Sequence, residues 1–523
     1  MLESRRPAAL LTTLLTAGAL GLSGFGLSGL ATASSAAPAP AGAAEVAVAE
    51  ASPSARAAAR KGLRVRVLKP KAMRKQVRVT VTGPRQNGKK FRKVIKATRW
   101  WPKVKPGVYR IKANTFRKYE QRVVPTVNVA KVRIPRSRKF REVKVTYANP
   151  RFCTGQGYSL KAWGDNTHGQ LGTTSPAWTT SPTTNRWISG LTAITGARSS
   201  TYALCNDGSV WAWGLNSSYQ LGVGHTKNRH YPVRVHEVSG VTALAAGTET
   251  AYALTADGRV WAWGSGRYGE LGNRRSGFGT VATKPVPVSL PPTIVQIAAG
   301  GRSAYALTDE GEVYAWGAGG VGQRGNGTTG AETPRPVKVA GLDDIVEIDA
   351  GQVTAYALGE DGTMYGWGGS NQGEIPNVAP STNTPAGIAT GVTKIGASQS
   401  AGFFVTGTLH GFGSGRHHDS GRDTGGSPTT PDAVPGPDGL FSSVLDLVGK
   451  GHTSYLLDEE GYVYSWGDNN RGQVGLRPIT GPGADEGLLP QEMNSGEYNA
   501  PARAIGAGQF NGYLLYSSSE IPR

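Results

Sequence analysis

The stretch from Tyr202 to Gly214 reads YALCNDGSVWAWG, and it decides the fold of the larger part of this chain. Two short runs rich in aromatic and β-branched residues are typical of strands, and they flank the pair Asp207-Gly208. Glycine after an acidic residue supplies the positive φ that a tight hairpin needs. We therefore expect two strands joined by a two-residue turn. The pattern recurs as YALTADGRVWAWG from Tyr252 and as YALTDEGEVYAWG from Tyr305.

The aromatic-glycine dipeptide at the end of this stretch recurs along the whole C-terminal part of the chain. Its spacing is 45 to 54 residues, and it begins at Trp163, Trp213, Trp263, Trp316, Trp367, Phe412 and Trp466. Four short strands in about 50 residues, repeated around a ring, are typical of a β-propeller. We predict an all-β, seven-bladed propeller over residues 151–523. Small residues between the units, such as Ala245-Ala246-Gly247, suit strands crowded around a central axis.

A glycine-rich signature follows each dipeptide, as in Asp165-Asn166-Thr167-His168-Gly169-Gln170-Leu171-Gly172. With this signature the chain resembles the regulator of chromosome condensation repeat family, whose propeller carries W-G-x-N-x-x-G-Q-L-G once per blade. The resemblance covers about 370 of the 523 residues. It implies that the repeated residues serve packing and turns, so that function lies where the blades differ. The sixth unit differs most, with Phe412 for Trp and no Gly-Gln-Leu-Gly.

The ends of the repeat region complement each other. Residues 504–508 and 513–516 resemble the first strands of a unit, and residues 158–163 resemble a return strand with poor partners before it. We expect these segments to pair and so to close the ring, which removes exposed strand edges.

The segment before the propeller is strongly basic. The chain has a net charge of +21, but residues 60–147 alone hold 30 basic and two acidic residues. Alternating runs such as Leu63-Arg64-Val65-Arg66-Val67 predict a small β-sandwich over residues 60–148. Val79 to Pro84 and Pro106 to Ile111 resemble the carboxypeptidase-regulatory or prealbumin-like sandwiches of secreted bacterial proteins.

Basic residues at the outward positions of these strands predict association with anionic polymers, and binding of nucleic acid only without sequence specificity. A solubilising face is the alternative. Trp100-Trp101 could stack on sugars or bases, or belong to the core and its rim. The candidate polyanion-binding residues are Lys89, Lys90, Arg92, Lys93, Arg99, Trp100, Trp101, Lys103, Arg136, Arg138 and Lys139.

The N-terminus indicates export. Arg5-Arg6, an apolar run from Ala8 to Leu30 and Ala31-Thr32-Ala33 predict a signal peptide over residues 1–33, with an uncleaved anchor as the alternative. Residues 34–59 are expected to form a disordered Ala/Pro-rich linker. Cys153 and Cys205 either form a disulfide or act as two small apolar residues, since spacing alone does not decide.

The sequence offers no catalytic, cofactor-binding or metal-binding constellation: the eight histidines have no metal-ligand spacing on a helix, and no phosphate loop or nucleophile elbow occurs. His417-His418-Asp419, with Asp423, is expected in a mobile, solvated loop rather than at a metal. The repeated motif residues are expected to be structural.

Three function classes follow. The first is a monomeric, non-catalytic binding protein, secreted and associated with the cell envelope, whose propeller loops recognise a protein or a glycan. Enzyme inhibition is a form of this that the resemblance implies. The second, also implied by the resemblance, is nucleotide exchange on a small GTPase, against which the signal peptide argues. The third is a sugar-active enzyme using carboxylates such as Glu249, Glu270 and Asp309.

Overall fold

The computed structural model of the chain describes residues 63–69, 77–86, 89–101, 105, 107–114, 116–118, 121–123, 126–127, 131–134, 141–146, 152–153, 157–173, 178–330, 332–378, 380–422, 430–475, 488–493 and 501–517. The predicted signal peptide and linker lie outside these residues. No helix of the described residues is long and apolar enough to cross a membrane.

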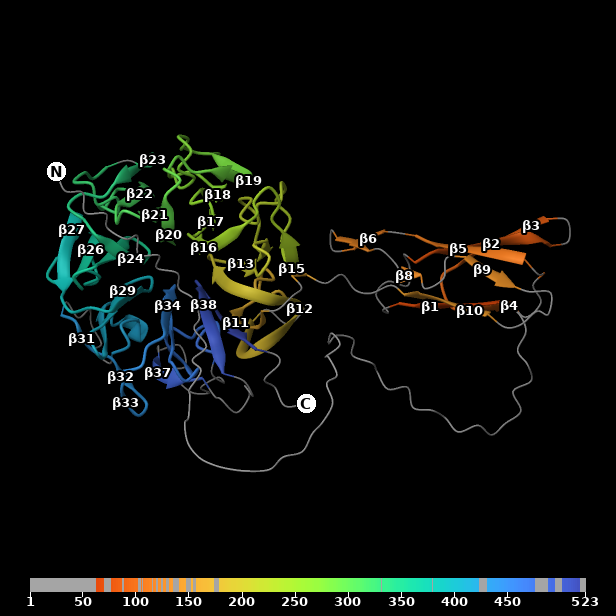
Figure 1. The fold of residues 1–523 in the computed structure, drawn as a ribbon. Helices are drawn as coiled ribbons and strands as arrows, with labels where there is room; N and C mark the ends of the chain where they lie inside the picture. The colour runs from red at the N-terminus through yellow and green to blue at the C-terminus, as the bar shows by residue number, and fades with distance from the viewer. Residues whose placement is uncertain are drawn as a thin grey trace, which may run out of the picture. The chain divides into compact units, whose positions relative to one another are not determined.

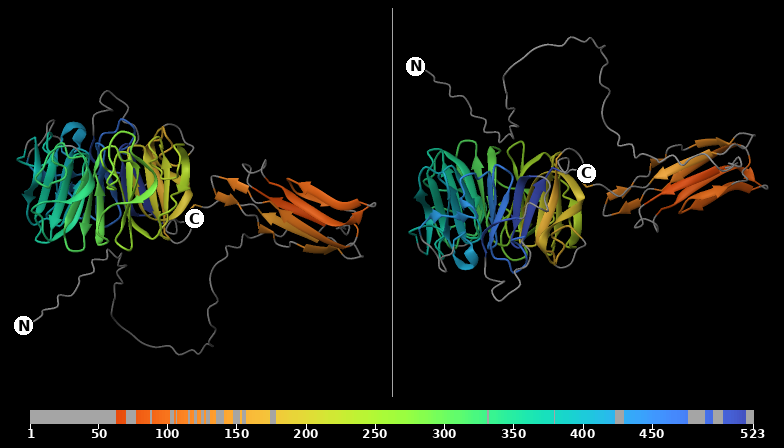
Figure 2. Two further views of the ribbon diagram at one scale, coloured as in Figure 1. Left: turned by 90° about the horizontal axis from the view of Figure 1, so that it is seen from above. Right: turned by 90° about the horizontal axis from the view of Figure 1, so that it is seen from below.

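Residues 60–148, the basic module, contain two four-stranded sheets and a hairpin. The first sheet consists of β4 (Arg99–Trp101), β1 (Leu63–Leu68), β10 (Arg141–Thr146) and β8 (Thr126–Val127). The second consists of β3 (Lys89–Ile95), β2 (Val79–Gln86), β5 (Gly107–Ala113) and β9 (Lys131–Ile134), and the hairpin of β6 (Phe116–Lys118) and β7 (Gln121–Val123). One core of alternating residues, including Val65, Val81 and Tyr109, joins the two sheets, which lie face to face (Figure 2).

The repeat region forms sheets around a common axis, with the first strand of each four-stranded sheet innermost and with β12 (Trp178–Gly196) and β38 (Ala502–Gly508) of a seven-stranded sheet beside them (Figure 1). Five sheets have four strands each, given from the inside outward. They are β16 (Val241–Ala246), β17 (Thr250–Thr255), β18 (Val260–Ser265) and β19 (Val281–Pro287); β20 (Ile294–Ala299), β21 (Ser303–Thr308), β22 (Val313–Gly317) and β23 (Thr333–Lys338); β24 (Ile345–Ala350), β25 (Thr354–Gly359), β26 (Met364–Gly369) and β27 (Ser381–Ala389); β28 (Lys394–Ala397), β29 (Ala401–Val405), β30 (Leu409–Gly413) and β31 (Asp432–Ala433); and β34 (Asp446–Lys450), β35 (Thr453–Leu457), β36 (Val463–Gly467) and β37 (Leu488–Glu492). The short strands β32 (Pro435–Gly436) and β33 (Gly439–Leu440) pair with each other, and the 3-10 turn η2 (Arg416–His418) follows β30.

A seven-stranded sheet contains both ends of the repeat region. Its order is β15 (Arg229–Arg234), β14 (Val210–Gly214), β13 (Ser200–Cys205), β12 (Trp178–Gly196), β11 (Tyr158–Asp165), β39 (Asn511–Tyr516) and β38 (Ala502–Gly508). The long strand β12 pairs with β11 on one side and with β13 on the other. Antiparallel pairing of β11 with β39 confirms the predicted closure by the two ends of the repeat region.

The hairpins differ in one detail from the two-residue turn that the sequence suggested. The N–H of Gly208 donates to the carbonyl of Cys205, and the N–H of Cys205 donates to the carbonyl of Ser209. Three residues therefore connect the strands, as a β-turn followed by Gly208 at φ 71°. The acidic residue before the glycine caps this turn, since the Asp207 carboxylate accepts the Ser209 N–H at 3.0 Å.

Neighbouring sheets are joined by one main-chain carbonyl that accepts two side-chain donors. Gln220 of the Gly-rich signature shows the arrangement: its carbonyl accepts the Tyr202 hydroxyl of its own unit at 2.9 Å and the Trp263 indole N–H of the next unit at 2.8 Å. The two rings meet edge to face with centroids 6.0 Å apart. The same pair of donors converges on Glu270, Gln323 and Gln473. This explains why Tyr, Trp and the signature recur together.

The sixth unit lacks one of the two donors, because it has Phe412 where the other units have Trp, as the sequence indicated. Phe412 packs edge to face on Tyr356 with centroids 5.9 Å apart, but a phenyl ring has no N–H to donate. The Glu374 carbonyl therefore accepts from a single side chain, the Tyr356 hydroxyl, at 2.6 Å.

This asymmetry yields a stability prediction. We expect Tyr356→Phe to lower the free energy of unfolding by about 1 kcal/mol or more beyond the loss in Tyr252→Phe, because a buried carbonyl left without a side-chain donor costs more than one that keeps a second donor. In Tyr252→Phe, the Glu270 carbonyl still accepts the Trp316 indole N–H at 2.8 Å. Urea unfolding of the two variants measures the difference, and equal losses would contradict the shared-carbonyl account.

Candidate functional site

The innermost strands end together at one mouth of the propeller, where backbone hydrogen bonds run from sheet to sheet. The N–H of Thr248 donates to Gly301, that of Gly301 to Gln352, that of Gln352 to Gln399 and that of Gln399 to Gly451, at 2.8 to 3.1 Å. Arg198 donates to Thr248 at 3.4 Å, and Gln509 donates to Ala197 at 3.2 Å across the closure. The predicted small residues at the axis are thus confirmed, since they allow backbones to approach this closely. A Cβ on Gly300 would lie 2.3 Å from the carbonyl oxygen of Gly351.

A cavity of about 680 Å³ opens at this mouth. Its walls are glycine-rich backbone, and the polar and charged residues among its lining include Arg198, Tyr268, Arg302, Glu332, Ser398 and Lys450. The Arg302 guanidinium lies 4.2 Å from the centroid of the Tyr268 ring, which holds this cation at the rim. A cavity of this volume suits a small molecule.

Two neighbouring strands depart from the small-residue rule at the axis. Each inner strand is followed by a strand that pairs with its outer side, and we compare the residue three positions before that second strand begins. In five cases this residue is small: Ala197, Gly247, Gly300, Gly351 or Gly508. Before β29 it is Ser398, and before β35 it is Lys450. The Lys450 ammonium donates to the carbonyl of Ala246, which lies across the axis on β16. The Ser398 hydroxyl is buried and has no hydrogen-bond partner among the described residues.

Titratable groups gather around the axis next to Lys450. Burial lowers the pKa of Lys450 to about 8, while the charge of Asp349 opposes the shift. Burial raises the pKa of Asp349 to about 7, and it also raises the pKa values of Glu347 and Asp446. Sequence inspection missed these groups, although each interrupts an otherwise small or apolar inner strand, and that interruption is a readable signal.

His452 and Asp419 form a polar contact between neighbouring units at the same mouth. His452 Nδ1 lies 2.6 Å from Asp419 Oδ2, and its Nε2 lies 2.9 Å from Gln399 Nε2. The expectation of a solvated loop is wrong for Asp419, whose side chain is fully buried behind η2. Asp419 takes the place that Gln or Glu holds in the other units, since the Trp466 indole donates to its carbonyl at 3.3 Å. His418 is half-buried, and Asp423 lies outside the described residues.

The pH dependence of stability tests the His452–Asp419 contact. Burial alone would lower the pKa of His452, but the hydrogen bond and charge of Asp419 outweigh it and raise the pKa above 6.5. A raised pKa stabilises the fold below pH 6.5, and the stabilisation disappears as pH rises through the folded-state value. The stability lost in His452→Gln should therefore be larger at pH 6 than at roughly pH 9.

Urea unfolding of wild type and His452→Gln at both pH values measures this change. His236→Gln, which removes an exposed imidazole, is the matched control. A stability difference that grows with pH would show that Asp419 does not hold the charged imidazole.

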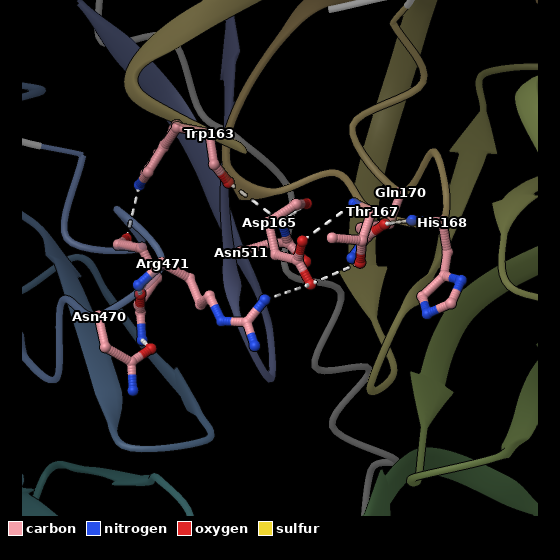
Figure 3. Close-up of polar contacts among 9 residues, drawn as sticks. Trp163, Asp165, Thr167, His168, Gln170, Asn470, Arg471 and Asn511 are labelled. Carbon is pink, nitrogen blue, oxygen red and sulfur yellow. Dashed lines mark hydrogen bonds and ion pairs between the residues drawn. The ribbon is translucent and has the colours of Figure 1, made fainter. Parts of the chain in front are cut away.

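The closure seam presents a second set of polar groups at this mouth (Figure 3). The Asn511 amide on β39 donates to the carbonyls of Trp163 and Asp165 on β11, at 3.3 and 2.5 Å. The Asp165 carboxylate accepts the N–H of Thr167 at 2.9 Å and lies 4.0 Å from the Arg471 guanidinium. These contacts join β11 to β39, although Asn511 Oδ1 is buried without a hydrogen-bond partner among the described residues.

Asn511→Ala tests the seam. We expect a loss of about 1–3 kcal/mol in the free energy of unfolding, because two buried carbonyls lose a donor. Asn470→Ala, which truncates an exposed asparagine in the adjoining loop, is the control and should unfold like wild type. A wild-type urea midpoint for Asn511→Ala would show that β11–β39 pairing needs no side-chain support.

Of the candidate polyanion-binding residues, the structure describes the side chains of Arg92, Lys93 and Arg99, and all three are exposed. Lys89, Lys90, Trp100 and Trp101 lie on strands β3 and β4. Lys103, Arg136, Arg138 and Lys139 lie outside the described residues.

Cys153 and Cys205, whose pairing the sequence left open, are bonded to each other in the structure, with their Cα atoms 5.8 Å apart. Residue 153 lies before the closing strand β11, and residue 205 ends β13. The disulfide therefore attaches the segment that enters the propeller to the sheet that holds both ends.

Two of the three carboxylates considered for sugar chemistry, Glu270 and Glu249, have hydrogen-bond partners. The buried Glu270 carboxylate accepts the Tyr268 N–H at 2.7 Å, and burial raises its pKa to about 7. Glu249 Oε2 accepts the Ser218 hydroxyl at 3.2 Å.

Within the described residues, no group of three or more His, Cys, Asp or Glu side chains could hold a metal ion.

The fold and the inter-sheet contacts define an all-β propeller built from a repeated unit. The profile of the regulator of chromosome condensation (RCC1) repeat matches residues 207–254, 257–307, 310–358 and 460–513. A second profile of the same repeat matches residues 241–270 and 294–323. The chain therefore carries RCC1 repeats in a propeller-type fold.

Curated relatives match part of this region. The human protein described as probable E3 ubiquitin-protein ligase HERC6 is 29% identical over 261 residues, which are 46% of this chain and 25% of HERC6. The mitochondrial RCC1 domain-containing protein RUG3 of Arabidopsis thaliana is 29% identical over 227 residues, 40% of this chain and 50% of RUG3. The chain thus spans half or less of these relatives.

Solved structures share the fold. Human WBSCR16 has a TM-score of 0.60 at 19% identity, covering 69% of this chain and 100% of its own. Prp20p of Saccharomyces cerevisiae, whose structure was described with its binding to Gsp1p and histones, has a TM-score of 0.59 at 21% identity, covering 71% and 94%.

Proposed function

We propose that this chain is an exported, non-catalytic binding protein, in which the basic module associates with an anionic polymer of the cell envelope and the propeller presents a face to a partner. The single observation that carries the proposal is the outer face of the sheet formed by β3, β2, β5 and β9. The predicted signal peptide supports the export part of the proposal.

The strand register places cations side by side on this face. Arg92 on β3 pairs with Thr82 on β2, Thr82 pairs with Arg110 on β5, and Arg110 pairs with Lys131 on β9. Arg92, Arg110 and Lys131 are exposed. Lys112 and Arg133 lie exposed on the same outward-facing side of β5 and β9.

A cross-strand pair of like charges destabilises a sheet, and Arg110 opposite Lys131 is such a pair. Neighbouring strands lie about 4.8 Å apart, so Arg110 and Lys131 are one strand apart, and Arg92 is two strands from Arg110 with Thr82 between them. None of the four strands contains Asp or Glu to neutralise these charges. A bound polyanion removes this repulsion and gains from releasing its counterions.

The propeller is the presenting part of the proposal. We infer that it has seven blades, with the seven-stranded sheet counted as two four-stranded blades that share β12. Repetition confines the motif residues to packing, so recognition falls to the loops and the mouth. Likeness to solved RCC1 structures concerns the fold alone, so nucleotide exchange stays a prediction from resemblance, as does enzyme inhibition.

Salt-dependent binding tests the basic face. We expect the full chain to bind immobilised teichoic acid with an affinity that falls steeply with salt. The triple variant Arg92→Gln/Arg110→Gln/Lys131→Gln should reduce the slope of log affinity against log salt by roughly two, since each lost contact removes somewhat less than one unit.

The control triple variant Arg234→Gln/Arg259→Gln/Arg335→Gln removes the same charge from exposed positions of the propeller. It should keep the wild-type slope. If both triple variants lose affinity equally, net charge and not this sheet face is responsible, and the proposal fails.

A further inference from the structure

We propose that the cavity at the mouth of the propeller is a binding site for a small molecule that carries a carboxylate, with the Lys450 ammonium and the Ser398 hydroxyl as the groups that receive it. The site is independent of the basic module and of the envelope association.

The first argument is the break in symmetry. Ser398 and Lys450 occupy the same position in two adjacent inner strands, where the other five units have only Gly or Ala. Both line the cavity. Their backbones are adjacent, since a Cβ placed on Gly449, the residue before Lys450, would be 2.7 Å from the Cβ of Ser398. A need for close packing explains the small residues but not the two polar ones.

The second argument is unused hydrogen-bonding capacity. The Ser398 hydroxyl is 2% exposed as a residue and has no hydrogen-bond partner within the described part of the chain, a cost that native proteins rarely leave unmet. An ammonium has three protons, and Lys450 gives one to the Ala246 carbonyl. No carboxylate of the described residues lies within ion-pairing distance of Lys450 Nζ. A ligand oxygen in the cavity would meet both needs.

The third argument is the balance of charge. Arg198 and Arg302 lie exposed at the rim, and Lys450 lies deeper, whereas Glu332 is the carboxylate of the cavity wall. The cavity wall carries more cations than carboxylates, although the buried Asp349 also acts on Lys450, and this excess favours an anionic ligand. Burial also favours an ion pair at Lys450, because a charged group in a low-dielectric site gains most from an opposite charge.

The fourth argument selects a carboxylate over a phosphate. Phosphate sites at Gly-rich backbone use several free N–H groups pointing inward. Here the N–H groups of Thr248, Gly301, Gln352 and Gln399 are already donated to the next sheet. Away from the exposed rim with Arg198 and Arg302, an ammonium and a hydroxyl are available, and they match the two oxygens and single charge of a carboxylate. Because Ser398 makes no hydrogen bond to Lys450, the pair is arranged to bind and not to activate the serine.

Isothermal titration calorimetry of the full chain at neutral pH tests the site, with D-glucuronate and L-glutamate as probes and D-glucose and L-glutamine as their uncharged counterparts. We expect saturable binding of at least one acid and none of its neutral counterpart. Lys450→Ala should weaken binding roughly tenfold or more, as expected for a lost charge-assisted hydrogen bond. Ser398→Gly should weaken it several-fold.

Both substitutions install residue types that other units carry at this position, and thermal melts at the wild-type temperature or above confirm folding. Lys284→Ala, which removes an exposed lysine on β19, is the matched control and should bind like wild type. The proposal is overturned if neither acid binds at concentrations up to about 10 mM, which is roughly ten times the dissociation constant of a weak, ~1 mM ligand. It is also overturned if Lys450→Ala binds with wild-type affinity, or if inorganic phosphate binds this cavity more tightly than either acid.

Discussion

The propeller depends on a main-chain carbonyl that two units share. In the repeated Gly-rich turn, a carbonyl oxygen receives the tyrosine hydroxyl of its own unit and the indole N–H of the next, so each unit finishes the hydrogen bonding of its neighbour. The same two rings supply the edge-to-face contact between the sheets. Each ring therefore serves packing and hydrogen bonding at once: replacing one ring removes one of the two donors, and only the loss of both leaves the carbonyl without a side-chain donor.

Periodicity predicted most of this fold because the decisive interactions repeat. Strand order, the hairpins, the crowding at the axis and the pairing of residues 158–163 with 513–516 all follow from one unit read seven times. The turn was mistaken by one residue, because Asp-Gly suits both a two-residue turn and a β-turn followed by a left-handed glycine. Pairing of Cys153 with Cys205 required Cα positions that no pattern supplies.

The candidate site was harder to foresee, because it lies in the exceptions to the pattern. Lys450 and Ser398 match no binding motif in the sequence. They stand out only when the inner strands are compared with one another, because the other strands have Gly or Ala at the same position. Asp419 sits in a loop whose glycines suggested solvent, yet it occupies a buried position of the repeat and contacts His452 of the next unit. In a repeat protein the residues that recur in every unit build the scaffold. The residues that could bind a ligand are those at which one unit differs from the others.

The pairing of β11 with β39 also has a consequence for how the chain comes to be folded. Asp165 and Asn511, which meet across that seam, are 346 residues apart. During synthesis β11 can pair with β12 early, but its second partner β39 is made only after almost the entire propeller. Ring closure is therefore a contact of very large sequence separation, hence a slow one. The Cys153–Cys205 bond joins positions only 52 residues apart and can anchor β11 early. The ring of a chain made from its N-terminus thus stays open until its last strand has been made.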